Sequence, residues 1–196
     1  MTLAQSQNDH KIRGRLFIIS GPSGAGKGTL VNAALKALPN LALSVSATTR
    51  PPRPGEIDGV TYHFITDEAF DELIANDGLL EWAEVHGQRY GTLTSEVTKA
   101  LDAGNDLVLE IDLQGFRQVK SHLSEMFSIF IAPPSMDELK KRLILRGTET
   151  SETLSRRLET AEVEMKAKDS YTVIIVNDDL EKATQELIAL MSPQGS

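Results

Sequence analysis

The chain has 196 residues, of which 28 are acidic and 20 basic, so its formal net charge is −8. This balance argues against a protein that binds nucleic acid regardless of sequence, since such a protein needs a basic surface. The chain has no cysteine, which excludes disulfides and thiolate metal sites and fits a reducing, cytoplasmic compartment, and it has no apolar stretch long enough to span a membrane.

The first residues, MTLAQSQNDHKIRGR, are polar and lack the apolar segment of a signal peptide. We expect a flexible tail over residues 1–13. The predicted domain therefore begins at residue 14.

Short apolar runs predict strands that are buried on both faces, and helical patterns alternate with them. The expected strands are Leu16–Ile19, Leu107–Ile111, Phe127–Ile131, Val173–Val176 and a weaker Leu43–Val45. The expected helices are Thr29–Leu38, Leu113–Leu123 and Asp179–Met191, with two more that carry apolar stripes, after Ser135 and over Leu154–Met165. This alternation predicts an α/β fold of three layers, with a parallel sheet covered by helices on both faces.

Two segments interrupt the alternation. Residues 48–96 begin with proline and glycine and continue with polar strand patterns around a helical one, "TDEAFDELIAND". Residues 140–162 are rich in arginine and broken at Gly147. We expect both to be insertions into a core formed by residues 14–47, 97–139 and 163–196.

The stretch LFIISGPSGAGKGTL joins the first strand to the first helix through a glycine-rich turn. Such a turn points backbone N–H groups into one concavity at a helix N-terminus, which favours a phosphate group. The pattern G-x-x-x-x-G-K normally continues with a hydroxyl residue, but here Gly28 follows Lys27 and Thr29 comes next. The alternative is a glycine-rich turn with an incidental surface lysine. The expected phosphate-binding residues are Gly21, Pro22, Ser23, Gly24, Ala25, Gly26, Lys27, Gly28 and Thr29.

The glycine after the lysine weakens the case for direct magnesium ligation by this loop. Mg²⁺ keeps several waters and is bound largely through substrate phosphates. We therefore expect Mg²⁺ to be held mainly by phosphates and water, with protein ligands unassigned.

A second group of candidate anion ligands follows in "SVSATTRPPRPGEIDGVTYHF". Arg50 and Arg53 lie on a backbone stiffened by prolines, and two guanidinium groups suit one phosphate dianion. Tyr62 and Tyr90 offer hydroxyl donors. Glu81 lies in the apolar run LLEWAEV, where an unpaired carboxylate would be costly, so we expect a specific partner for it.

At this point the sequence resembles the guanylate kinase family of nucleoside monophosphate kinases. The resemblance runs from about Arg15 to the C-terminus, through GPSGAGKGT, SVSATTRPPRPGE, LLEWAEVHGQRYGT, LVLEIDLQG, RLILRGTETSETLSRRL and VIIVNDDL, in the order of that family. It implies a P-loop core with a GMP-binding insertion and a lid, and ATP and Mg²⁺ as phosphoryl donor and cofactor. GMP is the implied acceptor and dGMP a further candidate.

The resemblance also implies roles for individual residues. The implied GMP ligands are Ser46, Arg50, Arg53, Tyr62, Glu81, Tyr90, Thr92 and Asp112. The implied catalytic residues, which attend the transferring phosphoryl group, are Lys27, Arg142, Arg146 and Arg157, and Asn177 is implied to lie near the adenine. Glu110 stands where some relatives have aspartate, and its role stays open.

The chemistry of guanine supports the acceptor independently. The base presents O6 as an acceptor beside the N1–H and N2–H₂ donors, so a carboxylate such as Glu81 can accept from both donors. A hydroxyl of Ser46 or Thr92 can donate to O6. Adenine has an acceptor at N1 and would repel the carboxylate.

No histidine is placed to act as a general base, and none is needed, because a phosphate monoester with a second pKa of ~6 is already ionised at neutral pH. Two alternatives remain open on the sequence. One is a non-catalytic guanylate-kinase-like binding module, although Lys27 and the lid arginines are retained here. The other is a sugar-phosphate kinase, against which Glu81 and Ser46 argue.

Overall fold

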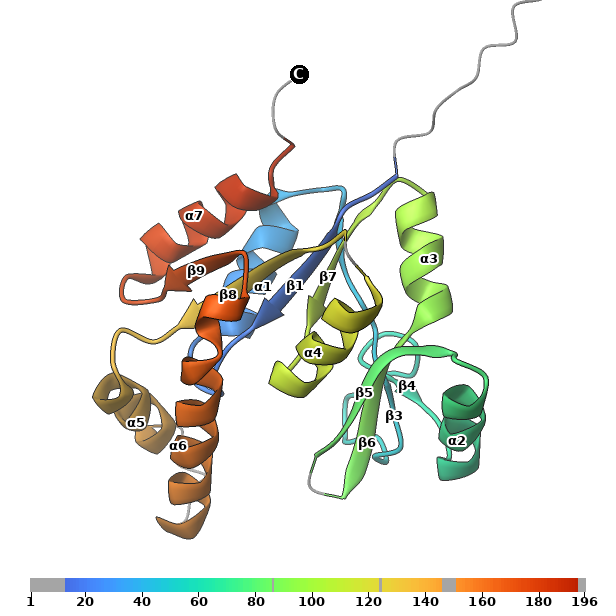
Figure 1. Cartoon of the computed structure of the whole chain (residues 1–196), viewed down its shortest axis with the longest axis horizontal. Helices are drawn as coiled ribbons and strands as arrows, with labels where there is room; N and C mark the ends of the chain where they lie inside the picture. Colours follow the sequence, from blue (N-terminus) through green and yellow to red (C-terminus); the bar gives the residue numbers. More distant parts are fainter. Residues whose placement is uncertain (1–12, 86, 124, 146–150, 194–196) are drawn as a thin grey trace, which may run out of the picture.

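The computed structural model describes residues 13–85, 87–123, 125–145 and 151–193. The predicted tail lies almost wholly outside these ranges. The described chain forms two sheets, one parallel and one mixed, which are linked by helices (Figure 1).

The larger sheet has five parallel strands in the order β2-β7-β1-β8-β9. Its strands are β1 (Leu16–Ser20), β2 (Leu41–Leu43), β7 (Asp106–Glu110), β8 (Phe127–Ala132) and β9 (Val173–Val176). The predicted parallel sheet is confirmed. The weakest predicted strand was placed two residues late, because Leu41 is the residue of β2 that turns into the core while Leu43 is 41% exposed.

Helices cover both faces of this sheet, as predicted. Alternate residues of β1 divide between two hydrophobic clusters. Phe17 and Ile19 pack with residues of α1 (Lys27–Ala37) and α7 (Leu180–Met191). Leu16 and Ile18 pack with residues of α3 (Thr94–Asp102) and α4 (Leu113–His122). α3 was not predicted. Its apolar stripe of Val97, Ala100 and Leu101 is regular but short, and the helix straddles the predicted boundary between the insertion and the core at residue 96.

The second sheet has four strands in the order β4-β3-β6-β5. They are β3 (Ala47–Thr48), β4 (His63–Phe64), β5 (Leu79–Val85) and β6 (Gln88–Leu93), with α2 (Asp67–Ala75) between β4 and β5. Thr66 caps α2 by accepting a hydrogen bond from the Ala69 N–H at 3.2 Å. β5 packs against α4 and so joins this sheet to the parallel one.

Two further helices, α5 (Met136–Leu145) and α6 (Ser151–Lys166), precede a short 3₁₀ helix at Lys168–Ser170. Ser135 caps α5, since its hydroxyl accepts from the Glu138 N–H at 3.1 Å. Leu139, Leu143 and Ala161 hold α5 and α6 together. In Figure 1 these helices lie at lower left and the second sheet with α2 at lower right, beyond the same end of the parallel sheet.

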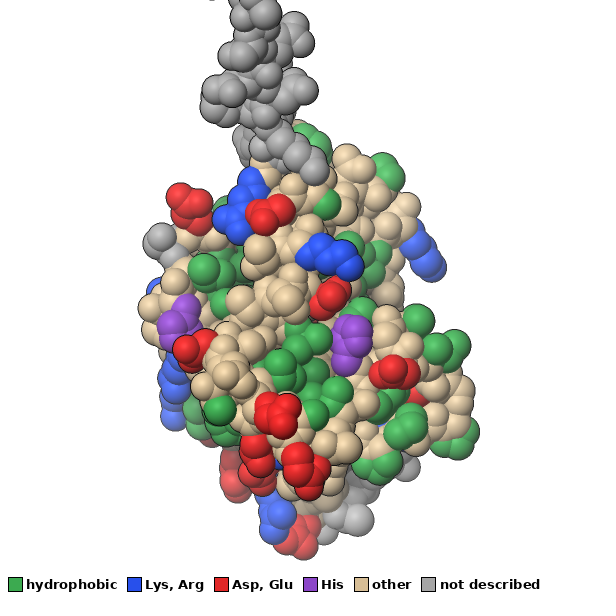
Figure 2. All heavy atoms as spheres, turned by 90° about the vertical axis from the view of Figure 1, so that its right-hand side faces the viewer, with side chains coloured by type: hydrophobic (Ala, Val, Ile, Leu, Met, Phe, Trp, Pro, Cys, Tyr) green, Lys and Arg blue, Asp and Glu red, His purple; other side chains and the backbone are tan. Residues whose placement is uncertain are grey.

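In the part of the chain that the structure describes, none of the helices combines the length and apolar composition needed to cross a membrane. On the face shown in Figure 2, lysine and arginine side chains are scattered among acidic and uncharged ones. This face carries no continuous basic patch.

Candidate active site

The glycine-rich loop lies between β1 and α1, and at two of its glycines the backbone leaves no room for a Cβ. Gly21 has φ of 144°, and a Cβ there would lie 2.2 Å from the Ile131 carbonyl oxygen. Gly26 has φ of 95°, and a Cβ there would lie 2.3 Å from Nδ2 of Asn177. Gly26 is also the N-cap of α1 and supplies no capping side chain, so the first amides of the helix face the loop.

A cavity of about 330 Å³ lies over this loop. It is lined by loop and α1 residues that include Lys27, Gly28, Thr29 and Asn32, and by Glu110 at the end of β7. The Lys27 ammonium donates to the carbonyl oxygens of Gly21 at 2.6 Å and Pro22 at 3.2 Å. The cavity thus combines a helix N-terminus, a lysine and a single carboxylate.

Gly28 and Glu110 are neighbours in this cavity. A Cβ at Gly28 would meet Oε2 of Glu110 at 3.7 Å, an ordinary contact, so space does not require glycine at this position. Among the residues that the structure describes, no three His, Cys, Asp or Glu side chains form a group that could hold a metal ion. Glu110 and the hydroxyl of Thr29 are oxygen donors of the kind that Mg²⁺ prefers, and they fit an ion that shares its ligands with phosphates and water.

Asn177 connects the phosphate loop with α5. Its side chain is 5% exposed and donates from Nδ2 to the Ala25 carbonyl oxygen at 2.8 Å. The backbone carbonyl oxygen of Asn177 accepts a hydrogen bond from Nη2 of Arg142 at 2.9 Å. Asn177, which the resemblance implies to lie near the adenine, is therefore packed beneath the loop.

A larger cleft of about 810 Å³ brings the predicted regions together. It is lined by Lys27, by Glu84 of β5, by Glu110 and Asp112 after β7, and by Arg157 and Glu164 of α6, among others. Lys27 and Arg157, which lie far apart in sequence, thus face one space. Arg142 contacts Asn177 instead, and Arg146 lies outside the described residues.

Glu164 is a residue of this cleft that sequence reasoning missed. It is 9% exposed, and burial raises the pKa of its carboxyl to about 7, with Lys27 lowering that pKa and Asp112 raising it. Its spacing from Ala161 on α6 could have marked it as half-buried. The lysine and aspartate that it faces come from distant parts of the chain and leave no local signal.

Glu81 lies in β5, 6% exposed, opposite Thr92 of β6. The Thr92 hydroxyl donates to Oε1 of Glu81 at 2.6 Å. The other oxygen, Oε2, lies so close to α4 that a Cβ on Gly115 would approach it to 2.4 Å. Burial raises the pKa of Glu81, while the hydrogen bond from Thr92 lowers it and the charge of Asp112 raises it further.

Asp112, a predicted GMP ligand, caps α4 in this structure. Its Oδ1 accepts from the Gly115 N–H at 2.8 Å, and the side chain lines the large cleft. Ser46, another predicted ligand, is half-buried and contributes its carbonyl oxygen to the His63 N–H at 2.9 Å.

The predicted phosphate ligands Arg50, Tyr62 and Tyr90 form one cluster. The Arg50 guanidinium lies over the rings of Tyr62 at 5.5 Å and Phe64 at 5.8 Å, and the Tyr62 and Tyr90 rings meet edge-on at 5.9 Å. The Arg53 side chain is exposed, as is most of the surrounding loop. The structure therefore brings three of these four side chains together.

Glu56 holds this cluster and was not predicted. Its Oε1 accepts from Nη2 of Arg50 at 2.8 Å and its Oε2 from the Arg53 N–H at 2.7 Å. These bonds lower the pKa of Glu56, the one from Arg50 most. Sequence offered one signal, a glutamate close after two arginines in RPPRPGE.

Comparisons with known proteins identify the family. The family model described as guanylate kinase matches residues 13–194. The chain is similar to a guanylate kinase of Thermobifida fusca (strain YX), 51% identical over 178 residues and 91% of each chain. It is also similar to one of Nocardia farcinica (strain IFM 10152), 50% identical over 184 residues, 93% of this chain and 95% of the relative.

A comparison with solved structures supports the same family through the fold. The crystal structure of guanylate kinase from Anaplasma phagocytophilum is similar with a TM-score of 0.73 at 32% identity, covering 92% of this chain and 86% of that one. The family match, the two curated relatives and this structure agree over almost the whole chain. The chain belongs to the guanylate kinase family.

Proposed function

We propose that this chain transfers the γ-phosphoryl group of Mg-ATP to GMP, giving ADP and GDP. The observation that carries the proposal is the buried carboxylate of Glu81, held by Thr92. A carboxylate in this position suits the paired N1–H and N2–H₂ donors of guanine. The names of the curated relatives support the same acceptor.

The donor phosphates lie, in this proposal, on the loop of residues 21–29. Backbone amides at the start of α1 donate to phosphate oxygens, and Lys27 exchanges its two carbonyl partners for them. Asn177 supports the loop from below and lies on the adenine side of the donor. Thr29 and Glu110, which line the same cavity, would be the residues to help hold Mg²⁺ there, and the bound ion would neutralise phosphate charge.

The acceptor base lies against Glu81, with guanine O6 toward Ser46. A hydroxyl has a single proton, and that of Thr92 already serves Glu81, so the donor to O6 is Ser46. Arg50, Arg53, Tyr62 and Tyr90 bind the GMP phosphate, and Asp112 completes the acceptor site. Glu56 orients Arg50.

Transfer needs alignment rather than a general base, because the GMP phosphate is already ionised at neutral pH. Residues 48–96 act as the GMP-binding insertion and residues 140–162 as the lid. Arg157, with Arg142 and Arg146, neutralises the charge that spreads over the transferring oxygens. Lys27 and Arg157 line one cleft, which supports a shared role at the reacting phosphates.

The cysteine-free chain fits a reducing compartment, and we place the reaction in the cytoplasm. We take dGMP as a second acceptor, since no residue proposed here binds the ribose 2′-hydroxyl. The reaction uses no nucleic acid or membrane partner.

The test is ADP release from Mg-ATP with GMP, AMP, UMP and ribose 5-phosphate offered separately. A site built on hydrogen bonds to guanine should favour GMP over AMP by up to ~10⁴–10⁵ in kcat/KM. Equal use of ribose 5-phosphate would make the chain a sugar-phosphate kinase. If none of the acceptors leads to ADP release, the chain would instead be a non-catalytic guanylate-kinase-like binding module.

A further inference from the structure

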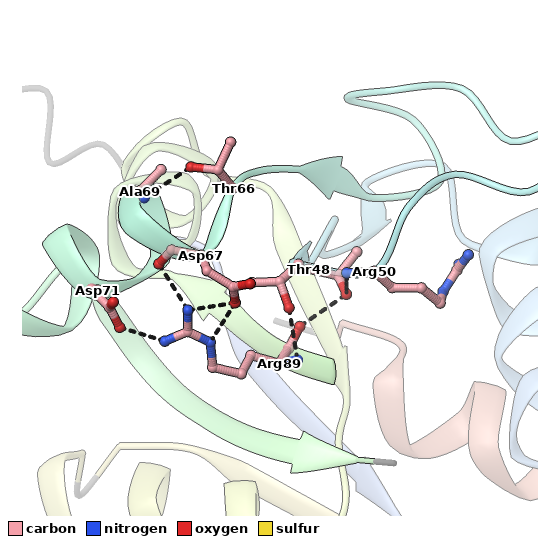
Figure 3. Close-up of polar contacts among 8 residues, drawn as sticks. Thr48, Arg50, Thr66, Asp67, Ala69, Asp71 and Arg89 are labelled. Atoms are coloured by element: carbon pink, nitrogen blue, oxygen red, sulfur yellow. Dashed lines mark hydrogen bonds and ion pairs between the residues drawn. The ribbon is translucent and has the colours of Figure 1, made fainter. Parts of the chain in front are cut away.

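Arg89 of β6 ties the second sheet to α2 through its side chain (Figure 3). Its guanidinium donates to Oδ1 of Asp67 from Nη2 at 2.6 Å and from Nε at 3.2 Å, and it pairs with Asp71 through Nη1. It also lies 4.8 Å from the centre of the Phe70 ring. The Arg89 side chain is 17% exposed, whereas those of Asp67 and Asp71 are 71% and 68% exposed.

The backbone of the same residue holds the segment that leads to Arg50. The Arg89 carbonyl oxygen accepts from the Thr48 hydroxyl at 2.9 Å and from the Thr49 N–H at 3.0 Å. The Arg89 N–H donates to the Thr49 hydroxyl at 3.1 Å. Thr48, fully buried, accepts in turn from the Arg50 N–H at 3.2 Å.

These bonds form a relay from the Arg89 carbonyl through the Thr48 hydroxyl to the Arg50 amide. β3 has only two residues, and beyond it the chain enters an exposed, proline-rich loop. Together with the two bonds between Thr49 and Arg89, the relay continues the attachment of this chain to β6 past the end of β3. It fixes the backbone from which the Arg50 guanidinium reaches the Tyr62 ring.

We propose that Arg89 is a positioning residue for the monophosphate site, holding β6 to α2 with its side chain and fixing Arg50 through Thr48. The inference rests on the proposed function, in which Arg50 binds the GMP phosphate. Without the guanidinium, two carboxylates four residues apart on α2 would repel each other, and this end of β6 would lose its side-chain attachment to α2. Arg50 would then sample more backbone conformations, and GMP binding would weaken.

Two variants test the relay at its two ends. Arg89→Met keeps the length and apolar body of the side chain, and Thr48→Val keeps its shape but removes both hydroxyl bonds. Each should raise KM for GMP about tenfold, the factor that corresponds to ~1.4 kcal/mol, and leave KM for ATP within about twofold. Arg13→Met, which breaks the exposed Arg13–Asp102 pair far from the cleft, is the matched control and should change neither value.

A loss of fold alone would lower the melting temperature and impair both substrates together, which would overturn the inference. The double variant Arg89→Met/Thr48→Val should raise KM for GMP by less than the product of the single effects, because both changes cut one relay. A multiplicative result would show two independent effects and would also overturn it. If either variant fails to fold, Asp71→Asn replaces it, since Asp71 pairs with Arg89. This variant should raise KM for GMP about two- to threefold. An unchanged KM for GMP would count against the relay.

Amide hydrogen exchange separates this inference from the proposed function. Arg89→Met should speed exchange at Thr49 and Arg50 by about tenfold in the protein without substrates, whether or not GMP is the acceptor. Unchanged exchange at both amides overturns the relay even if GMP is used. Failure of the wild-type chain to phosphorylate GMP, with faster exchange in the variant, overturns the proposed function alone.

Discussion

Glu81 and Thr92 face each other across the β5–β6 ladder, with the threonine hydroxyl 2.6 Å from Oε1 of the carboxylate. The pairing orients a buried carboxylate whose pKa burial raises, and the hydrogen bond acts against that rise. Thr92 thus helps to keep Glu81 ionised, the form that accepts hydrogen bonds from guanine.

Glu81→Gln should lower kcat/KM for GMP by about 10²-fold or more, because the amide presents a donor to the guanine N–H groups. ATP binding, measured by calorimetry, should change by less than about twofold. Glu72→Gln on the exposed surface of α2 is the control. Equal losses for both nucleotides would remove Glu81 from the guanine site.

Lys27→Met should lower kcat by about 10²–10³-fold, since it removes the cation proposed to follow the transferring phosphoryl group. The folded state should persist, as circular dichroism and the melting temperature would report. Lys36→Met, in the last turn of the same helix, should be fully active. Normal turnover in Lys27→Met would contradict the proposed role of the loop.

Glu164 makes stability depend on pH. Its pKa is about 7 in the folded protein, against 4.5 for an ordinary glutamate, so the folded state holds its proton more tightly. The folded state therefore loses stability as pH rises from 4.5 to 7, and the full cost is present above pH 7.

Glu164→Gln should consequently raise the melting temperature at pH 8, by roughly 2–4 °C for each kcal/mol recovered, and change it little at pH 5. Differential scanning calorimetry at the two pH values measures this. A larger gain at pH 5 than at pH 8 would reverse the sign and refute the assignment.

Gly26→Ala should destabilise the protein and weaken ATP binding, because the new Cβ would lie 2.3 Å from Nδ2 of Asn177. Gly55→Ala is a matched control, since Gly55 has a similar φ of 88° but no atom within 4 Å of a Cβ. The control should cost only the strain of a left-handed conformation, about 1–2 kcal/mol. Denaturant titration of both variants isolates the clash; equal costs would mean that Asn177 moves aside freely.

Much of the fold was predictable because the buried strands are short apolar runs separated by helical stripes. The failures concern α3 and β2. α3 buries two side chains only, and β2 turns a different leucine inward than its composition indicates. In both cases, contacts with other elements of the fold determine which side chains are buried.

The residues of the candidate site likewise divide into those that the sequence predicted and those that it did not. The phosphate loop was predictable, since its glycines and Lys27 are contiguous. Glu164 was not, because its significance comes from Lys27, which only the fold brings close. Glu56 lies six residues after Arg50, but the sequence does not show which of the nearby arginines its side chain holds. The bonds of Arg89 to Thr48 and Asp67 likewise join residues that sequence cannot pair.

The side chain of Asn177 donates a hydrogen bond to Ala25 in the phosphate loop. Its backbone carbonyl oxygen accepts one from the Arg142 side chain of α5. A displacement of α5 would therefore shift the position of Ala25 through these two successive hydrogen bonds. A compound that separates α5 from Asn177 would therefore disturb the loop without occupying the nucleotide site.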